Sequence, residues 1–177
     1  SFAVRRLGCG CGVVISASHN DGRYNGVKCY GPDGCQLTDE PAAVVTGKIE
    51  EIPYFVPEQD SFRGFQEKGM IHFIPQSLWE DYYRTVMAEA IAPEKIAKAG
   101  VNVVYTPLCG TGNEPVRHVL GVLGANVTVV PVQEKPDGDF RTCEYPNPET
   151  DAALNESYKI ARETHPDLIL GTDPDCD

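Results

Sequence analysis

The sequence predicts an α/β fold of three-layer α/β/α units, in which helices cover both faces of mostly parallel sheets. Two observations support this class. Short apolar runs alternate with helix-like segments of 3.6-residue period, and glycine, proline or capping residues mark the ends of these segments. In the second half we expect strands at 101–106, 126–131 and 167–171, and helices at 113–123 and 149–164. Because each strand is followed by a helix, the strands should run parallel.

The first fifty residues predict a shorter version of the same pattern. An apolar, β-branched run from Cys11 enters small polar residues, which places Ser18, His19 and Asn20 on a turn at the end of a strand. We expect a strand at 26–30 to return past this turn. Thr38 and the acidic residues after it then indicate a capped helix that continues to about Glu51.

The middle of the chain separates two predicted domains. Residues 53–72 have no sustained period and are interpreted as a linker, with room for a short hairpin. Ser77 and Glu80 have capping-box spacing, which predicts a helix to about Ile91. Pro93 should break it before a short helical stretch that ends at Gly100. We therefore expect a first domain over 1–52, a linker over 53–75 and a second domain over 76–177.

Composition excludes several classes of protein. The 177 residues carry 15 basic and 26 acidic side chains, a net charge of −11 that argues against a nucleic-acid-binding surface. No apolar run approaches the roughly 20 residues of a membrane span. The seven cysteines have no regular framework, which favours reduced thiols and a cytoplasmic protein. Cys9 and Cys11 form a Cys-x-Cys pair, but without a second pair at ligand spacing a zinc site is disfavoured.

An acidic cluster closes the chain. Asp173, Asp175 and Asp177 alternate with Pro174 and Cys176 directly after the last predicted strand. Carboxylates spaced in this way can converge on one hard divalent cation, which is magnesium, manganese or calcium rather than zinc. Parallel sheets bind ligands at the carboxyl ends of their strands. A solvated acidic loop is the alternative interpretation.

Two turns have residues that could belong to a functional site. Ser18 is well placed for a reaction, although a purely structural hydrogen-bonded turn is also consistent with Ser-His-Asn. A serine hydrolase is disfavoured, since the serine lacks flanking glycines and His19 is adjacent to it. The turn 110–112 leads a strand into a helix, so it is either a phosphate cradle or simply a tight turn.

Six segments, in this order, resemble the landmarks of the α-D-phosphohexomutases, the phosphoglucomutase/phosphomannomutase family. They are 15–20 (Ile-Ser-Ala-Ser-His-Asn), 24–28 together with 30–34, 105–113 (Tyr-Thr-Pro-Leu-Cys-Gly-Thr-Gly-Asn), 134–140, 146–149 and the aspartate loop. Each is weak evidence alone, but their shared order along nearly the whole chain makes the resemblance specific. The chain departs from the family pattern at Asp21, Cys109 and Arg141, and these departures bear on substrate preference rather than on reaction type.

This resemblance implies a set of site residues. Ser18 would be the catalytic phosphoserine. Its phosphate would bind a Mg²⁺ ion together with Asp173, Asp175 and Asp177. A divalent ion is needed there because a phosphoserine adds about −1.5 to −2 charge to three carboxylates.

The resemblance also implies residues that act on the substrate, a small sugar phosphate. Lys28 would bind it and exchange a proton with its reacting hydroxyl. His19 would support catalysis, and Asn20 substrate binding, by shaping the serine loop. The implied reaction interconverts hexose 1-phosphate and hexose 6-phosphate of glucose or mannose through a bisphosphate, with hexose 1,6-bisphosphate as activator.

Members of this family have four domains, and the chain resembles the end of domain 1 and most of domain 2. Domains 3 and 4, which discriminate the sugar and clamp its phosphate, would then be missing. We therefore expect negligible turnover from the isolated chain. Two other functions remain consistent with the sequence: a phosphopentomutase, and a metal-binding or structural segment that is inactive in isolation.

Overall fold

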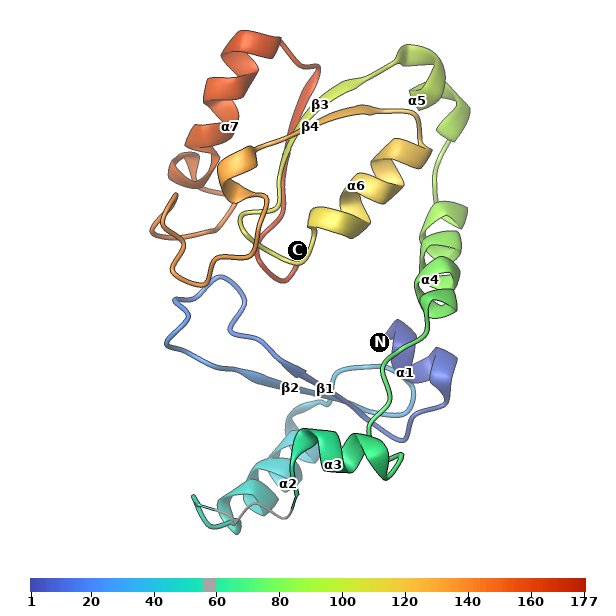
Figure 1. The fold of residues 1–177 in the computed structure, drawn as a ribbon, viewed down its shortest axis with the longest axis vertical. Coiled ribbons are helices and arrows are strands. Elements are labelled where there is room, and N and C mark those ends of the chain that lie inside the picture. The colour runs from blue at the N-terminus through green and yellow to red at the C-terminus, as the bar shows by residue number, and fades with distance from the viewer. Residues whose placement is uncertain (56–59) are drawn as a thin grey trace. The chain divides into compact units, whose positions relative to one another are not determined.

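A computed structural model describes residues 1–55 and 60–177 (Figure 1). The α-helices are α1 (Phe2–Leu7), α2 (Asp39–Glu50), α3 (Phe62–Glu67), α4 (Gln76–Ala88), α5 (Pro93–Ala99), α6 (Asn113–Val122) and α7 (Asp151–Thr164), and η1 (Pro131–Gln133) is a 3₁₀ helix. The strands are β1 (Gly12–Ile15), β2 (Val27–Tyr30), β3 (Asn102–Thr106), β4 (Asn126–Val129) and β5 (Leu168–Gly171).

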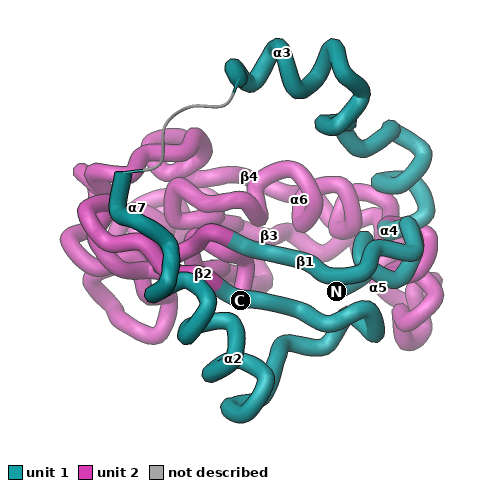
Figure 2. The backbone as a smooth tube through the Cα atoms, turned by 90° about the horizontal axis from the view of Figure 1, so that it is seen from below, with its two compact units in different colours: residues 1–14, 28–82 teal, residues 15–27, 83–177 magenta. Residues whose placement is uncertain are grey.

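The chain divides into two compact units, coloured separately in Figure 2. The first unit contains residues 1–14 and 28–82, and the second contains 15–27 and 83–177. The serine loop thus belongs to the same unit as the aspartate loop, although 155 residues of sequence separate Ser18 from Asp173. The predicted domain boundaries at 52 and 76 stay a prediction.

The second unit is built on a three-stranded parallel sheet of order β4-β3-β5. In the register, Tyr105 of β3 lies beside Val129 of β4 and Leu170 of β5. Four of the five β3 residues are buried, as a central strand covered on both faces requires. The α/β class with a parallel sheet is therefore confirmed.

Helices α6 and α7 pack against this sheet, α6 on β4 and α7 on β3 and β5. Helix α7 begins at Asp151, two residues after the predicted start at 149. Thr150 caps it, because the Thr150 Oγ1 accepts a hydrogen bond from Ala153 N at 3.4 Å. Helix α5 ends at Ala99, and the residue that caps it, Gly100, has a left-handed φ of 61° that suits a glycine.

The first unit has little buried apolar surface among the described residues. Strands β1 and β2 form a two-stranded sheet, and Val4 of α1 packs against Gly12 of β1. The side chains of Val13 and Val14 are exposed. An ion pair from Arg6 to Asp81, at 2.6 Å, joins α1 to α4. Strand β1 therefore has apolar side chains that no described residue buries.

Two local predictions were wrong. The described part of the predicted linker contains helix α3 rather than a hairpin, and Ser61 caps it by accepting a hydrogen bond from Gly64 N at 3.0 Å. Residues 56–59 of that linker lie outside the described residues. Helix α4 begins at Gln76, so Ser77 lies inside its first turn instead of capping it, and the helix ends at Ala88 rather than 91.

A buried polar network holds the loops that follow β3 and β4. The Thr106 hydroxyl donates to Gln133 Oε1 at 2.7 Å and accepts from Leu108 N at 3.1 Å. Gln133 is itself fully buried, and its Nε2 donates to Ala153 O at 3.3 Å. Each buried polar group of this network thus has a partner, as stable interiors require.

We expect Thr106→Val to destabilise the protein by about 1–3 kcal/mol, because it leaves Gln133 Oε1 and Leu108 N buried without a hydrogen-bond partner. Thr106→Ser keeps the hydroxyl and is the control for lost packing. Urea denaturation followed by circular dichroism measures both. A Thr106→Val protein as stable as the wild type would contradict the role of this network.

Candidate functional site

The second unit brings one serine hydroxyl against a cluster of carboxylates. The Ser18 Oγ lies 2.9 Å from Asp173 Oδ2 and 3.0 Å from Asp175 Oδ1. Asp177 completes the cluster, in which ligand oxygens of the three aspartates lie within 4.8 Å of one another. A hydroxyl has one proton to donate, so two carboxylates compete for it. The arrangement therefore concentrates negative charge around an oxygen atom.

The aspartate loop, residues 172–177, leaves the carboxyl end of β5 and closes on itself. Asp177 N donates to Asp173 Oδ1 at 2.9 Å, and Asp173 N donates to Asp177 O at 3.1 Å. Cys176 N donates to Asp173 O at 3.0 Å, with the Cys176 backbone in the left-handed region at φ 77°. Asp173 is 5% exposed. These bonds turn three alternating carboxylates toward one point.

The serine loop is held by a residue that the sequence analysis did not single out. The Ser16 hydroxyl accepts a hydrogen bond from Ser18 N at 3.1 Å and lies 3.3 Å from Asp175 Oδ2, to which it donates. The spacing of Ser16 and Ser18 is a sequence signal for this contact, since a serine side chain often bonds to the backbone two residues further on. Ser18 itself has a left-handed φ of 54°, a conformation that costs a non-glycine residue on the order of 1 kcal/mol.

His19 is the other predicted residue at the cluster. Its Nδ1 lies 3.3 Å from Ser18 Oγ and 3.6 Å from Asp173 Oδ2. The ring packs edge-on against Tyr145, a contact that sequence patterns did not indicate, with centroids 4.8 Å apart. This packing orients the imidazole, whose Nδ1 can donate to the carboxylate or accept from the hydroxyl according to its tautomer.

The remaining predicted residues lie at different places. Asn20 is exposed at the end of the serine turn, where its backbone N donates to Ala17 O at 3.0 Å. Lys28 lies on β2 in the first unit and is half-buried. The roles expected for these two residues stay predictions.

The residues present fit a hard divalent cation. The converging donors are oxygens of carboxylates and a hydroxyl, which suit Mg²⁺ better than a soft metal. Burial, and then the charges of Asp173 and Asp177, raise the pKa of the Cys176 thiol, so it stays protonated near neutral pH. Its sulfur packs toward Gly112 and is not among the converging oxygens.

Tyr105 of β3 contacts the start of the aspartate loop. Its hydroxyl lies 2.9 Å from Thr172 Oγ1, at the start of the aspartate loop, and the side chain is fully buried. Burial raises the pKa of Tyr105 to about 12, although the Thr172 hydrogen bond opposes this shift. The phenol therefore remains neutral at every physiological pH.

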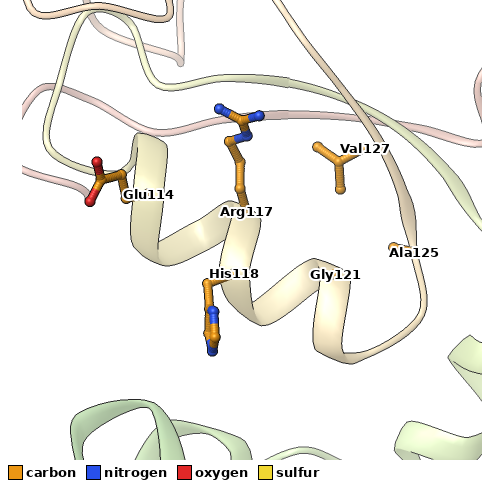
Figure 3. Close-up of a pocket in the computed structure, with 6 residues that line it drawn as sticks. All are labelled: Glu114, Arg117, His118, Gly121, Ala125 and Val127. Atoms are coloured by element: carbon orange, nitrogen blue, oxygen red, sulfur yellow. The ribbon is translucent and has the colours of Figure 1, made fainter. Parts of the chain in front are cut away.

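A separate pocket lies on the surface between α6 and β4 (Figure 3). Both of its basic side chains, Arg117 and His118, already have partners. Arg117 Nη1 donates to Glu134 Oε1 at 2.7 Å, and the His118 ring stacks on Tyr83 with centroids 4.1 Å apart. Figure 3 shows the two side chains pointing to opposite sides of α6. This arrangement does not favour binding of a phosphate in the pocket.

Comparisons with known proteins show which family the chain resembles over its length. The family model described as phosphoglucomutase/phosphomannomutase, alpha/beta/alpha domain II, matches residues 80–177, and the model for domain I matches 1–54. The chain, over its whole length, is 35% identical to a phosphoglucomutase of Staphylococcus epidermidis and 36% identical to one of Staphylococcus aureus. It spans 32% of the length of each of these relatives.

A solved structure shows the same fold. A Thermus thermophilus protein assigned as a phosphomannomutase superposes with a TM-score of 0.76 at 21% identity, over 99% of this chain and 37% of that one. The fold and its parallel sheet place the chain in the α/β class of proteins. Within that class, the chain belongs to the phosphoglucomutase/phosphomannomutase family. No helix within 1–55 and 60–177 has the length and apolarity needed to cross a lipid bilayer.

Ser16→Ala removes both hydrogen bonds that this hydroxyl makes to the serine loop and to Asp175. We expect a loss of stability of about 1 kcal/mol, because these bonds are only partly buried. Ser16→Thr retains the hydroxyl and serves as the control. Thermal unfolding of the metal-free protein measures the difference. Equal melting temperatures for Ser16→Ala and the wild type would contradict the bridging role.

The raised pKa of Tyr105 predicts a pH dependence of stability. The folded state holds the phenol proton more tightly than the unfolded state, whose tyrosines ionise near pH 10. The stabilisation is complete below that pH and is lost as the pH rises from about 10 toward 12. Near-ultraviolet absorbance titration of the wild type against Tyr105→Phe isolates this group. Ionisation of Tyr105 near pH 10 in the folded protein would contradict the expectation.

Proposed function

We propose that this chain carries the phosphoserine and metal-binding segments of a hexose phosphate mutase. The observation that carries the proposal is the position of Ser18 Oγ, 2.9 Å and 3.0 Å from two carboxylates of an aspartate loop. A serine used only for a turn has no need of this environment. A serine that carries a phosphoryl group needs a counter-ion beside it, and the carboxylates would hold that ion.

The proposed reaction transfers one phosphoryl group in each of two steps. A sugar-phosphate hydroxyl attacks the phosphorus of phospho-Ser18, the bond from phosphorus to Ser18 Oγ breaks, and a sugar bisphosphate forms. The hydroxyl proton passes to a base, for which Lys28 is the candidate. After the bisphosphate turns over, Ser18 Oγ attacks its other phosphate, the bond from that phosphorus to the sugar oxygen breaks, and the leaving oxygen takes the proton back from Lys28. The enzyme returns to its starting state, since one phosphoryl group was given and one was taken.

In this proposal the chain's own residues supply position and charge. Asp173, Asp175 and Asp177, with the Ser18 phosphate, would hold Mg²⁺, which when bound withdraws charge from the transferring phosphoryl group. His19, oriented by its ring contact with Tyr145, would hold the Ser18 oxygen at a fixed angle. Asn20 would bind substrate from the exposed end of the turn.

The substrates are proposed from the relatives. The chain's matches in two Staphylococcus species are named phosphoglucomutases, which favours glucose 1-phosphate and glucose 6-phosphate, with the mannose phosphates second. A hexose 1,6-bisphosphate would restore Ser18 phosphorylation. Because the chain spans 32% of those relatives, the rest of the sugar-binding surface is proposed to lie in further domains, and the isolated chain is expected to be inactive.

All seven cysteines are free thiols, which supports a cytoplasmic protein.

The test uses the full-length protein, assayed for glucose 1-phosphate conversion with Mg²⁺ and glucose 1,6-bisphosphate. We expect Ser18→Ala to abolish turnover and to remove one phosphate, about 80 Da, from the intact mass. Asp173→Asn should lower kcat by at least about 100-fold, because it removes a ligand charge at the reacting phosphate.

Asp151→Asn is the matched control, since this carboxylate lies at the first turn of α7 and bonds Tyr158 rather than the site. It should leave kcat within about twofold of the wild type. A full-length protein that carries no phosphate on Ser18 and converts neither glucose nor mannose phosphates would refute the proposed function.

A further inference from the structure

The turn 110–112, between β3 and α6, contacts the aspartate loop instead of presenting its amides to a ligand. Thr111 N donates to Pro174 O at 2.9 Å, and Thr111 Oγ1 donates to the same oxygen at 3.2 Å. Gly110 N is also used, because it donates to Pro107 O at 2.8 Å. The glycines that suggest a phosphate cradle in the sequence therefore serve a contact within the protein.

Both glycines of this turn are needed for close approach. A β-carbon at Gly110 would contact Pro174 Cα and lie 2.7 Å from Pro174 O. One at Gly112 would lie 2.6 Å from Tyr105 Oη and 2.7 Å from Thr172 Oγ1. Gly112 has φ −67° and ψ −15°, which any residue adopts, so its constraint is steric and not conformational. The turn is packed against the aspartate loop with no room for a methyl group.

The position of Pro174 gives this contact its importance. Pro174 lies between Asp173 and Asp175, and its carbonyl belongs to the peptide plane that leads into Asp175. Two donors from Thr111 fix that plane, while the hydrogen bonds between residues of the loop itself join Asp173 to residues 176 and 177. The turn thus contacts the segment that sets the separation of two carboxylates.

We propose that the turn 110–112 positions the aspartate loop for cation binding, with Thr111 as a positioning residue that fixes the Pro174 carbonyl. This inference rests on the proposed function, because it assumes that the aspartates hold a divalent cation. It adds that the affinity for the cation depends on a turn that supplies no ligand. Displacement of Pro174 changes the distance between the carboxylates of Asp173 and Asp175. A divalent ion with short metal–oxygen bonds tolerates little change in that distance.

The experiment measures Mn²⁺ binding to the full-length protein by isothermal titration calorimetry, with the metal-free melting temperature recorded for each variant. Gly110→Ala should weaken Mn²⁺ binding by about tenfold or more, because the methyl group displaces Pro174. Gly121→Ala is the matched control: its β-carbon has no neighbour within 4 Å, so binding should stay within about twofold.

A second pair of variants tests the hydrogen bond without crowding. Thr111→Val removes the Oγ1 donor and should weaken Mn²⁺ binding by about two- to fivefold, whereas Thr111→Ser should match the wild type. This pair decides the question if Gly110→Ala does not fold. A structural role alone would lower the metal-free melting temperature without changing the Mn²⁺ affinity of the folded protein.

The outcomes separate this inference from the proposed function. If the wild type binds Mn²⁺ and Gly110→Ala and Thr111→Val bind it equally well, the positioning role is refuted while the mutase proposal stands. If Asp173→Asn and the wild type both fail to bind Mn²⁺, the metal site itself is refuted, and this inference with it. Weaker binding by both turn variants, with normal binding by Gly121→Ala and Thr111→Ser, supports the positioning role.

Discussion

The site depends on holding negative groups together at one point. Carboxylates whose oxygens lie within 4.8 Å repel one another by on the order of 1–4 kcal/mol per pair at surface-like dielectric constants. The fold opposes this repulsion with backbone amides, because Asp177 N donates to Asp173 and the loop closes on itself. This repulsion lowers the stability of the folded protein, and binding of a ligand with the opposite charge restores it. The acidic loop is therefore understood best together with the cation that it would bind.

The parallel sheet explains how distant segments reach this point. Strands β3, β4 and β5 run in one direction, so the connections that follow them leave the same edge of the sheet. After β3 comes the turn 110–112, after β4 the buried Gln133, and after β5 the aspartate loop. Gln133 bonds to Thr106 and Thr111 bonds to Pro174, so each connection is fastened to another. The serine loop joins them through the Ser16 and Ser18 hydroxyls.

Local signals predicted most of the second unit. Its strands and helices were found within about two residues, because residues such as Thr150 and Gly100 mark helix ends chemically. Helix α3 was missed since it has six residues, with Gly64 inside it, and shows no period. Ser77 and Glu80 matched a capping box, which would start the helix at residue 78, but the helix begins at Gln76. The sequence showed Gly110 and Gly112 as small residues, whereas the Pro174 carbonyl that their turn contacts is 63 residues from Thr111. Such contacts leave no local pattern.

The separation in sequence between Ser18 and the aspartates has a consequence for biosynthesis. Their hydrogen bonds span 155 and 157 residues, and the aspartate loop directly follows β5, which pairs with β3. Contacts this distant form late, since the entropy of closing a long loop is lost before the contact gains anything. If the aspartates hold a divalent cation as proposed, a nascent chain that has not yet emerged as far as Asp177 cannot offer that cation all of its ligands. Metal loading would then act as a check on assembly, because it rewards only chains whose sheet has closed.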